Sequence, residues 1–121
     1  MKSEWITHKG VRIFHLRYDC FGDDSEGLGK EVGESIVEAM KEPPDSILEL
    51  VDVTDTTGSR KNVEILRDAA NQCKSRIRKV AVLGISGVRQ LIAQGVARIT
   101  GMNFTLFDDI EKAKDFLVEN K

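Results

Sequence analysis

Residues 79–92 read KVAVLGISGVRQLI and combine a buried strand with the start of a helix. The apolar run from Val80 to Gly84 has the length and composition of a strand that is covered on both faces. A turn at residues 85–87 follows, and apolar residues then recur every three or four positions to about Ile99, which is the period of one helical face. A buried strand that leads into an amphipathic helix is typical of an α/β protein with a parallel sheet.

Strands and helices alternate on both sides of this stretch. The pattern predicts strands at residues 4–8, 11–18, 47–53, 80–84 and 103–107. It predicts helices at residues 25–41 and 60–76, a third that ends near residue 99, and a fourth that begins at Asp108 or Asp109. The order is therefore β-β-α-β-α-β-α-β-α, which indicates one α/β domain over residues 1–121 with a mostly parallel sheet and an antiparallel N-terminal strand.

The first two predicted strands form a hairpin, because only residues 9–10, Lys-Gly, separate them and glycine can take a positive φ. The register that follows pairs Ile6 with Ile13 and Trp5 with Phe14. Side chains alternate between the two faces of a strand, so each face of the hairpin carries apolar residues. We therefore expect packing against both faces of the sheet.

Composition and charge exclude several classes of function. The 121 residues include 18 Lys and Arg against 20 Asp and Glu, a net charge of −2, which argues against a nucleic-acid-binding surface. No apolar run is long enough to span a bilayer, and the N-terminal MKSEWITHKG lacks the apolar stretch of a signal peptide. Cys20 and Cys73 have no CxxC spacing, and no other cluster has the spacing of a metal or cofactor site. We expect a cytoplasmic protein with neither a membrane span nor a bound cofactor.

Three stretches of the chain follow the pattern of a known family. They are VDVT at residues 51–54, KVAVLGISGVRQLI at 79–92 and FDDIEKAKDFL at 107–117. Together with the hairpin and a helix from Ser59, they resemble STAS domains (the domains of sulfate transporters and anti-sigma factor antagonists), above all the stand-alone SpoIIAA-like group. The resemblance covers nearly the whole chain. It implies a SpoIIAA-like α/β fold and a regulatory role in which the domain binds another protein.

The resemblance also implies a site at the turn that follows the third strand. In family members that are phosphorylated, this strand leads into Asp-Ser-Ser-Gly, and a partner kinase modifies a serine there, which controls binding to that kinase. This chain has Asp55, Thr56, Thr57 and Gly58 at the corresponding positions, with threonine in place of serine. The resemblance therefore implies Thr56 or Thr57 as phosphoacceptor and a kinase-type anti-sigma factor as partner. The next three residues, Ser-Arg-Lys, depart from the apolar continuation of phosphorylated members.

Elementary electrostatics also favours an anion at this turn. A phosphate on either threonine adds about −1.5 to −2 charge beside a helix N-terminus. Unpaired backbone N–H groups and the helix dipole favour a negative charge there. The alternative is an unmodified capping turn, in which Ser59 or Thr57 accepts a hydrogen bond from a backbone N–H of the helix. We expect the N–H groups of the turn to point outward, toward an anion or a partner.

A second turn, at residues 84–87, joins a strand to a helix N-terminus in the same way. It is a candidate anion site, or else a tight turn that Ser86 caps. It contains neither GxGxxG nor a Walker lysine, so it is no nucleotide fingerprint. In a parallel sheet both turns lie at the same edge. The predicted partner- or anion-binding residues are Asp55, Gly58, Ser59, Arg60, Lys61, Ser86 and Gly87.

Two charged segments have simpler interpretations beside functional ones. The acidic loop around Asp23 and Asp24 lacks an EF-hand pattern, which favours a solvated loop over a cation site. A basic group at a predicted helix end is either solvated or in contact with an acidic partner or lipid headgroups, and its members are Lys74, Arg76, Arg78 and Lys79.

No set of residues indicates catalysis. No Ser/His/Asp or Cys/His constellation is evident, and His8 and His15 lie apart along the hairpin. We expect a non-catalytic regulatory module that binds a protein partner, with phosphorylation of Thr56 or Thr57 as its control. The alternative is a carrier of a lipid or another small molecule, anionic or apolar. The apolar faces of the hairpin and the turn at residues 84–87 favour that alternative.

Overall fold

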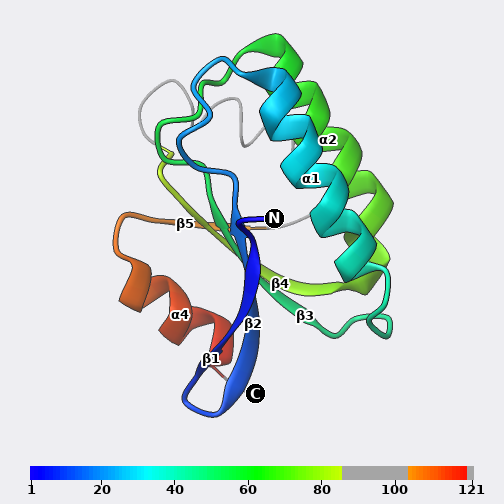
Figure 1. The fold of residues 1–121 in the computed structure, drawn as a ribbon. Helices are drawn as coiled ribbons and strands as arrows, with labels where there is room; N and C mark the ends of the chain where they lie inside the picture. Colours follow the sequence, from blue (N-terminus) through cyan, green and yellow to red (C-terminus); the bar gives the residue numbers. More distant parts are fainter. Residues whose placement is uncertain (86–103, 120–121) are drawn as a thin grey trace.

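A five-stranded sheet forms the centre of the molecule (Figure 1). The computed structural model describes residues 1–85 and 104–119. The strands lie side by side in chain order and are β1 (Glu4–His8), β2 (Val11–Arg17), β3 (Ile47–Asp52), β4 (Ile77–Leu83) and β5 (Thr105–Phe107). β1 and β2 are antiparallel, and every later pair is parallel. The mostly parallel α/β fold with an antiparallel N-terminal strand is therefore confirmed.

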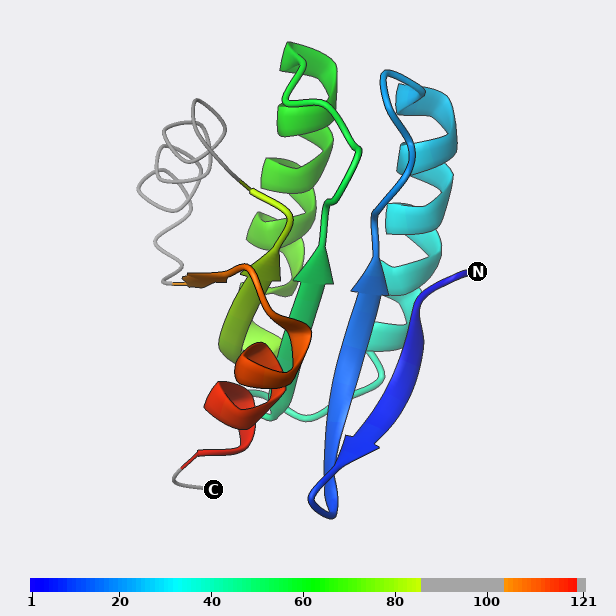
Figure 2. The ribbon, with the colours of Figure 1, turned by 90° about the vertical axis from the view of Figure 1, so that its left-hand side faces the viewer.

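Helices cover both faces of this sheet (Figure 1, Figure 2). α1 (Ser25–Ala39) and α2 (Arg60–Cys73) pack side by side on one face, and α4 (Ile110–Val118) packs on the other. α1 connects β2 to β3, and α2 connects β3 to β4, so both connections move in the same direction across the sheet. Because crossovers between parallel strands are right-handed, both helices lie on the same face. A short 3₁₀ turn, Lys74–Arg76, joins α2 to β4. The helix expected to end near residue 99 lies outside the described residues.

The hairpin has the predicted register. Ile6 pairs with Ile13, and Trp5 pairs with Phe14, on whose ring it stacks at a centroid distance of 4.6 Å. The alternation of side chains then separates two hydrophobic clusters. Phe14 belongs to the cluster beneath α1 and α2, whereas Ile13 belongs to the cluster beneath α4. Both faces of the sheet are thus covered, as the sequence predicts.

The boundary between α2 and β4 differs from the prediction. α2 ends at Cys73 rather than Arg76, and β4 begins at Ile77 rather than Val80. The reason is strand pairing, because Ile77 lies opposite Ile47 of β3 and extends the parallel ladder toward the start of both strands. The apolar residues continue at helical spacing as far as Ile77, although the chain has already left α2 and Ile77 itself is in a strand.

The predicted basic group at a helix end is divided between two elements, because Lys74 and Arg76 belong to the 3₁₀ turn after α2 but the other two residues do not. Arg78 and Lys79 lie on β4, where side chains alternate between the faces of the sheet. Arg76 Nη1 donates to the main-chain oxygen of Glu42 at 2.8 Å. Lys79 Nζ donates to the main-chain oxygen of Phe116 at 2.6 Å and lies over the Phe116 ring. Two of these cations therefore stabilise the fold instead of forming one binding surface.

Gly84 brings the chain that leaves β4 against the chain that leaves β3. Its φ is +89°, and a Cβ atom here would lie 2.5 Å from the backbone nitrogen of Thr54. Real Cβ atoms essentially never approach backbone atoms so closely, and this φ favours glycine. Any larger residue must therefore displace the chain that leaves β3.

We predict that Gly84→Ala lowers the free energy of unfolding by about 2 kcal/mol or more, because the methyl group meets the Thr54 backbone and the conformation is strained. Gly33→Ala is the matched control. Gly33 lies in α1 with open space at its Cβ position, so alanine there is neutral or stabilises by up to about 1 kcal/mol. Urea denaturation followed by circular dichroism measures both changes. Equal stabilities of the two variants would contradict the close approach.

Candidate functional site

The loops that follow β2 and β3 run side by side and are joined by backbone hydrogen bonds. The N–H of Cys20 donates to the oxygen of Thr54 at 2.7 Å, and the N–H of Gly22 donates to the oxygen of Asp55 at 2.8 Å. The N–H of Thr57 donates to the oxygen of Gly22 at 3.0 Å. These bonds continue the parallel pairing of the two strands beyond their ends. The two loops therefore form one structure at this edge of the sheet.

Thr56 lies at the centre of this junction and is only 3% exposed. Its hydroxyl donates to the main-chain oxygen of Tyr18 at 2.5 Å and accepts from the N–H of Phe21 at 3.1 Å. Its own N–H donates to the oxygen of Val53 at 3.1 Å. The expectation that the N–H groups of this turn point outward is wrong for Thr56 and Thr57, because both donate within the protein.

Thr57 and Ser59 have different roles at the start of α2. Thr57 is half-buried, and its hydroxyl donates to Oδ1 of Asp23 at 2.5 Å. Ser59 caps the helix, because its Oγ accepts from the N–H of Asn62 at 3.2 Å. Of the two predicted capping residues, Ser59 is therefore the one that caps α2.

The remaining predicted site residues differ in exposure. Gly58 is half-buried and lines the cavity described below. Arg60 Nε pairs with Oε1 of Glu64 at 3.3 Å. Ser86 and Gly87 lie outside the described residues. The residues of the first turn that are exposed are Asp55, Arg60 and Lys61.

Asn62, which the sequence pattern does not single out, is fully buried beneath this turn. Its Nδ2 donates to the main-chain oxygens of Gly22 and Thr57 at 3.1 and 3.0 Å. Its Oδ1 accepts from Oγ of Ser25 at 2.6 Å. One side chain thus joins the start of α1, both loops and α2. No local signal marks it, because asparagine near a helix start is ordinarily exposed.

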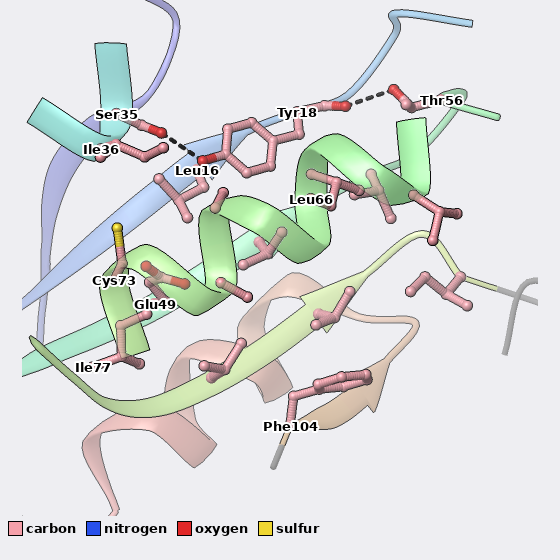
Figure 3. A pocket seen from close by; sticks show the side chains of 18 of the residues that line it. Leu16, Tyr18, Ser35, Ile36, Glu49, Thr56, Leu66, Cys73, Ile77 and Phe104 are labelled. Carbon is pink, nitrogen blue, oxygen red and sulfur yellow. Dashed lines mark hydrogen bonds between the residues drawn. The ribbon is translucent and has the colours of Figure 1, made fainter. Parts of the chain in front are cut away.

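A cavity of about 170 Å³ lies between the sheet and the helices α1 and α2 (Figure 3). Side chains of β2, β3 and β4 form one wall, and side chains of the two helices form the other. Thr56, Thr57 and Gly58 also line it, so the turn after β3 and the cavity adjoin. Most of the lining is apolar and includes Leu16, Ile36, Val51, Leu66, Ala70 and Phe104.

Among the described residues that line the cavity, Glu49 is the one acidic side chain. It lies on β3 between Ile47 and Val51, which face the same hydrophobic cluster. Its side chain has no hydrogen bond or ion pair with any described residue. Burial raises the pKa of Glu49 to about 8, so most of these carboxyl groups are protonated at neutral pH.

The polar neighbours of Glu49 are uncharged. The Tyr18 hydroxyl and Oγ of Ser35 are 2.5 Å apart, and Ser35 donates to the main-chain oxygen of Val32 at 2.7 Å, so Tyr18 is the donor to Ser35. Burial raises the pKa of Tyr18 well above its usual value. Burial and the Glu49 carboxylate raise the pKa of Cys73 to about 11. Near neutral pH, Glu49 is therefore the group of this set that changes charge.

The sequence does not predict the cavity, but it contains a signal for Glu49. Residues 47–53 read ILELVDV, in which one carboxylate interrupts the apolar part of a strand that the pattern predicts to be buried. A charged residue is almost never fully buried unless it is paired or functional. Glu49 was therefore identifiable as unusual, although its surroundings were not.

Other ionisable groups of the described chain stabilise the fold. Nε2 of His8 lies 2.7 Å from Oδ1 of Asp115, which connects the hairpin to α4. Although burial opposes it, hydrogen bonds from the chain at Lys2 and Ser3 lower the pKa of Glu31. The described residues contain no group of three or more side chains that could hold a metal ion. None of the helices in residues 1–85 and 104–119 is long and apolar enough to cross a membrane.

The order of strands and the placement of helices define a SpoIIAA-like fold. A solved structure with this arrangement is an uncharacterized protein of the DUF3478 family with a SpoIIAA-like fold, from Shewanella loihica PV-4. It is 15% identical to this chain, and the match covers 95% of this chain and 91% of that chain with a TM-score of 0.64. No family model and no curated protein matches the sequence. The SpoIIAA-like fold predicted from the sequence is confirmed, and at this identity the likeness concerns the fold alone.

We predict that ionisation of Glu49 lowers the stability of the protein as the pH rises from about 4.5 to 8. The pKa of Glu49 is raised from 4.5 to about 8 in the folded protein, so the folded state holds the proton that the unfolded chain has lost. Glu49→Gln removes this effect, and its stability relative to wild type increases by about 2–4 kcal/mol across this window.

Urea denaturation at several pH values measures this difference. His15 acts with the opposite sign, because burial lowers its pKa, but it is present in both proteins and cancels in the comparison. Glu111→Gln, an exposed change on α4, serves as control and leaves the pH dependence as in wild type. A wild-type-to-Glu49→Gln difference that is constant with pH would contradict the prediction.

Proposed function

We propose that this protein is a non-catalytic binding protein that holds a small, mostly apolar molecule in the cavity between the sheet and the helices α1 and α2. The observation that supports this proposal most directly is the cavity of about 170 Å³, bounded by side chains such as Leu16, Val51 and Leu66. The space is a partly open, mostly apolar pocket rather than a sealed void in the interior. A space of this size between well-formed elements is thus a natural ligand site.

The volume of the cavity limits the size of the ligand. An engineered apolar cavity of about 150 Å³ stays dry and binds benzene, so a similar volume suits one ring or a short hydrocarbon chain. Drug-sized ligands occupy pockets of about 300–1,000 Å³. The sequence suggests a carrier of a lipid or another small molecule. Of these ligands, one smaller than a two-chain lipid fits the cavity best.

The charge of the lining argues against an anionic ligand. Lys, Arg and His are absent from the described lining residues. Among these residues, the Glu49 carboxyl group is the one that becomes negatively charged as the pH rises toward 8. A carboxylate or phosphate that entered would lose its hydration without a cation to replace it. Of the two kinds of small molecule that the sequence leaves open, anionic and apolar, we therefore propose an apolar one.

We predict that hexan-1-ol binds the wild-type protein saturably and shifts the NMR signals of amides around the cavity. Ala70→Leu places a larger side chain in the cavity and weakens this binding at least about tenfold, because it removes apolar space for the ligand. Asn71→Leu adds the same side chain at the next position, which is exposed, and leaves binding unchanged. Either an absence of saturable shifts or equal affinity of Ala70→Leu and wild type would refute the proposal.

A second candidate function is regulated docking of a protein partner, such as a kinase-type anti-sigma factor, at the turn between β3 and α2. The observation that favours it is an exposed surface formed by Asp55, Arg60 and Lys61, with the half-buried Thr57 beside it. Thr57 is the better phosphoacceptor, because it is half-buried whereas Thr56 is only 3% exposed. Two cationic side chains near a helix N-terminus would then stabilise the added phosphate.

We predict that coexpression with a kinase-type anti-sigma factor from the same organism adds a phosphate to the chain, detected by intact mass spectrometry. Thr57→Val abolishes the modification because it removes the acceptor hydroxyl. Thr56→Val, the matched change at the neighbouring position, retains it. An unmodified wild-type chain, or equal modification of wild type and Thr57→Val, would count against this second function.

A further inference from the structure

We propose that Glu49 selects the ligand of the cavity and that this ligand is a small apolar molecule with a primary amino group. The inference rests on the proposed function, since it assigns the polar end of the molecule that the cavity holds. Three features support it: the position of the Glu49 carboxyl group, its lack of a partner among the described residues, and the absence of a cation from the described lining.

The Glu49 side chain projects from the middle of the central strand into the cavity (Figure 3). Phe14 of β2 and Val80 of β4 lie opposite it in the sheet, and both belong to the cluster beneath α1 and α2. The carboxyl group lies toward Cys73 of α2, and the residue is 6% exposed. A group in this position meets the contents of the cavity.

This carboxyl group has unused hydrogen-bonding capacity. A buried polar group without a hydrogen bond costs about 1–3 kcal/mol, so buried carboxyl groups in proteins are ordinarily paired. The hydroxyls of Tyr18 and Ser35 bond to each other, and neither bonds to Glu49. A ligand with a suitable donor would therefore supply a partner that the described residues do not.

An ammonium group suits this position better than other polar groups of similar size. Its N–H groups donate to the carboxylate, and charge-assisted hydrogen bonds are roughly twice as strong as neutral ones. A hydroxyl forms only a neutral hydrogen bond, and a carboxylate ligand is repelled when Glu49 is ionised. A primary amine on a short apolar body thus matches both the acidic group and the apolar walls.

Binding of an amine is coupled to release of a proton. At neutral pH Glu49 holds a proton, because burial raises its pKa to about 8. When the ammonium group enters, this proton leaves to solvent, and the ion pair adds no net charge to the cavity. The Tyr18 phenol, just after the end of β2, and the Cys73 thiol of α2 face Glu49 and stay neutral because burial raises the pKa of each. The affinity for an amine therefore increases as the pH rises toward 8.

Three probes with the same hexyl chain test the inference: hexylamine, hexan-1-ol and hexanoate. At a pH of about 8 we expect wild type to bind hexylamine at least about tenfold more tightly than hexan-1-ol, and hexanoate most weakly. Glu49→Gln loses the preference and binds hexylamine no more tightly than hexan-1-ol. Glu111→Gln removes a carboxylate from α4, on the opposite face of the sheet, and keeps the preference.

Titration calorimetry in two buffers of different ionisation enthalpy gives a second readout. Near neutral pH, wild type releases close to one proton for each hexylamine bound and none for hexan-1-ol. Absence of this release, or a preference for hexylamine that persists in Glu49→Gln, overturns the inference. If hexan-1-ol binds and hexylamine gains nothing, the cavity function stands and the role of Glu49 fails. If neither probe binds, both proposals fail.

Discussion

The central strand β3 has no side that is open to water. It pairs with β2 along one edge and with β4 along the other, and a hydrophobic cluster covers each of its faces. Ile47, Leu48 and Leu50 are at most 2% exposed, as such enclosure requires. Glu49 stands in the middle of this series. The cavity beside the Glu49 carboxyl group leaves space for it that close packing would not. The central position of β3 therefore explains both the burial of the strand and the location of the candidate site.

The turn that follows the same strand forms part of the cavity wall. Thr56 and Asn62 are buried polar residues whose side-chain groups bond to the loop after β2, and these bonds hold the two loops in one arrangement. Satisfied buried networks of this kind are rigid. Thr57 and Gly58 belong to this turn and also line the cavity. The surface proposed for a protein partner and the space proposed for a small molecule therefore share a wall.

Local patterns in the sequence were sufficient for most of the fold, because alternation and helical period are properties of neighbouring residues. The hairpin register and the cap at Ser59 are of this kind. The start of β4 is not, since Ile77 continues the period of α2 and is drawn into the sheet by pairing with Ile47. The burial of Thr56 and the cavity depend likewise on side chains far apart in the chain. For Glu49 the sequence shows an unusual residue, and only the packing shows what surrounds it.

The strand order has a consequence for how the protein is made. Each strand of the sheet lies next to the one synthesised just before it, from β1 to β5. A nascent chain that leaves the ribosome can add strands at one growing edge, and no finished pair has to separate to admit a later strand. The edge of the newest strand is covered when the next strand pairs with it, whereas the outer edge of β1 has no partner among the described strands. The unpaired edges of β2, β3 and β4, which could promote aggregation, are thereby exposed only briefly during translation.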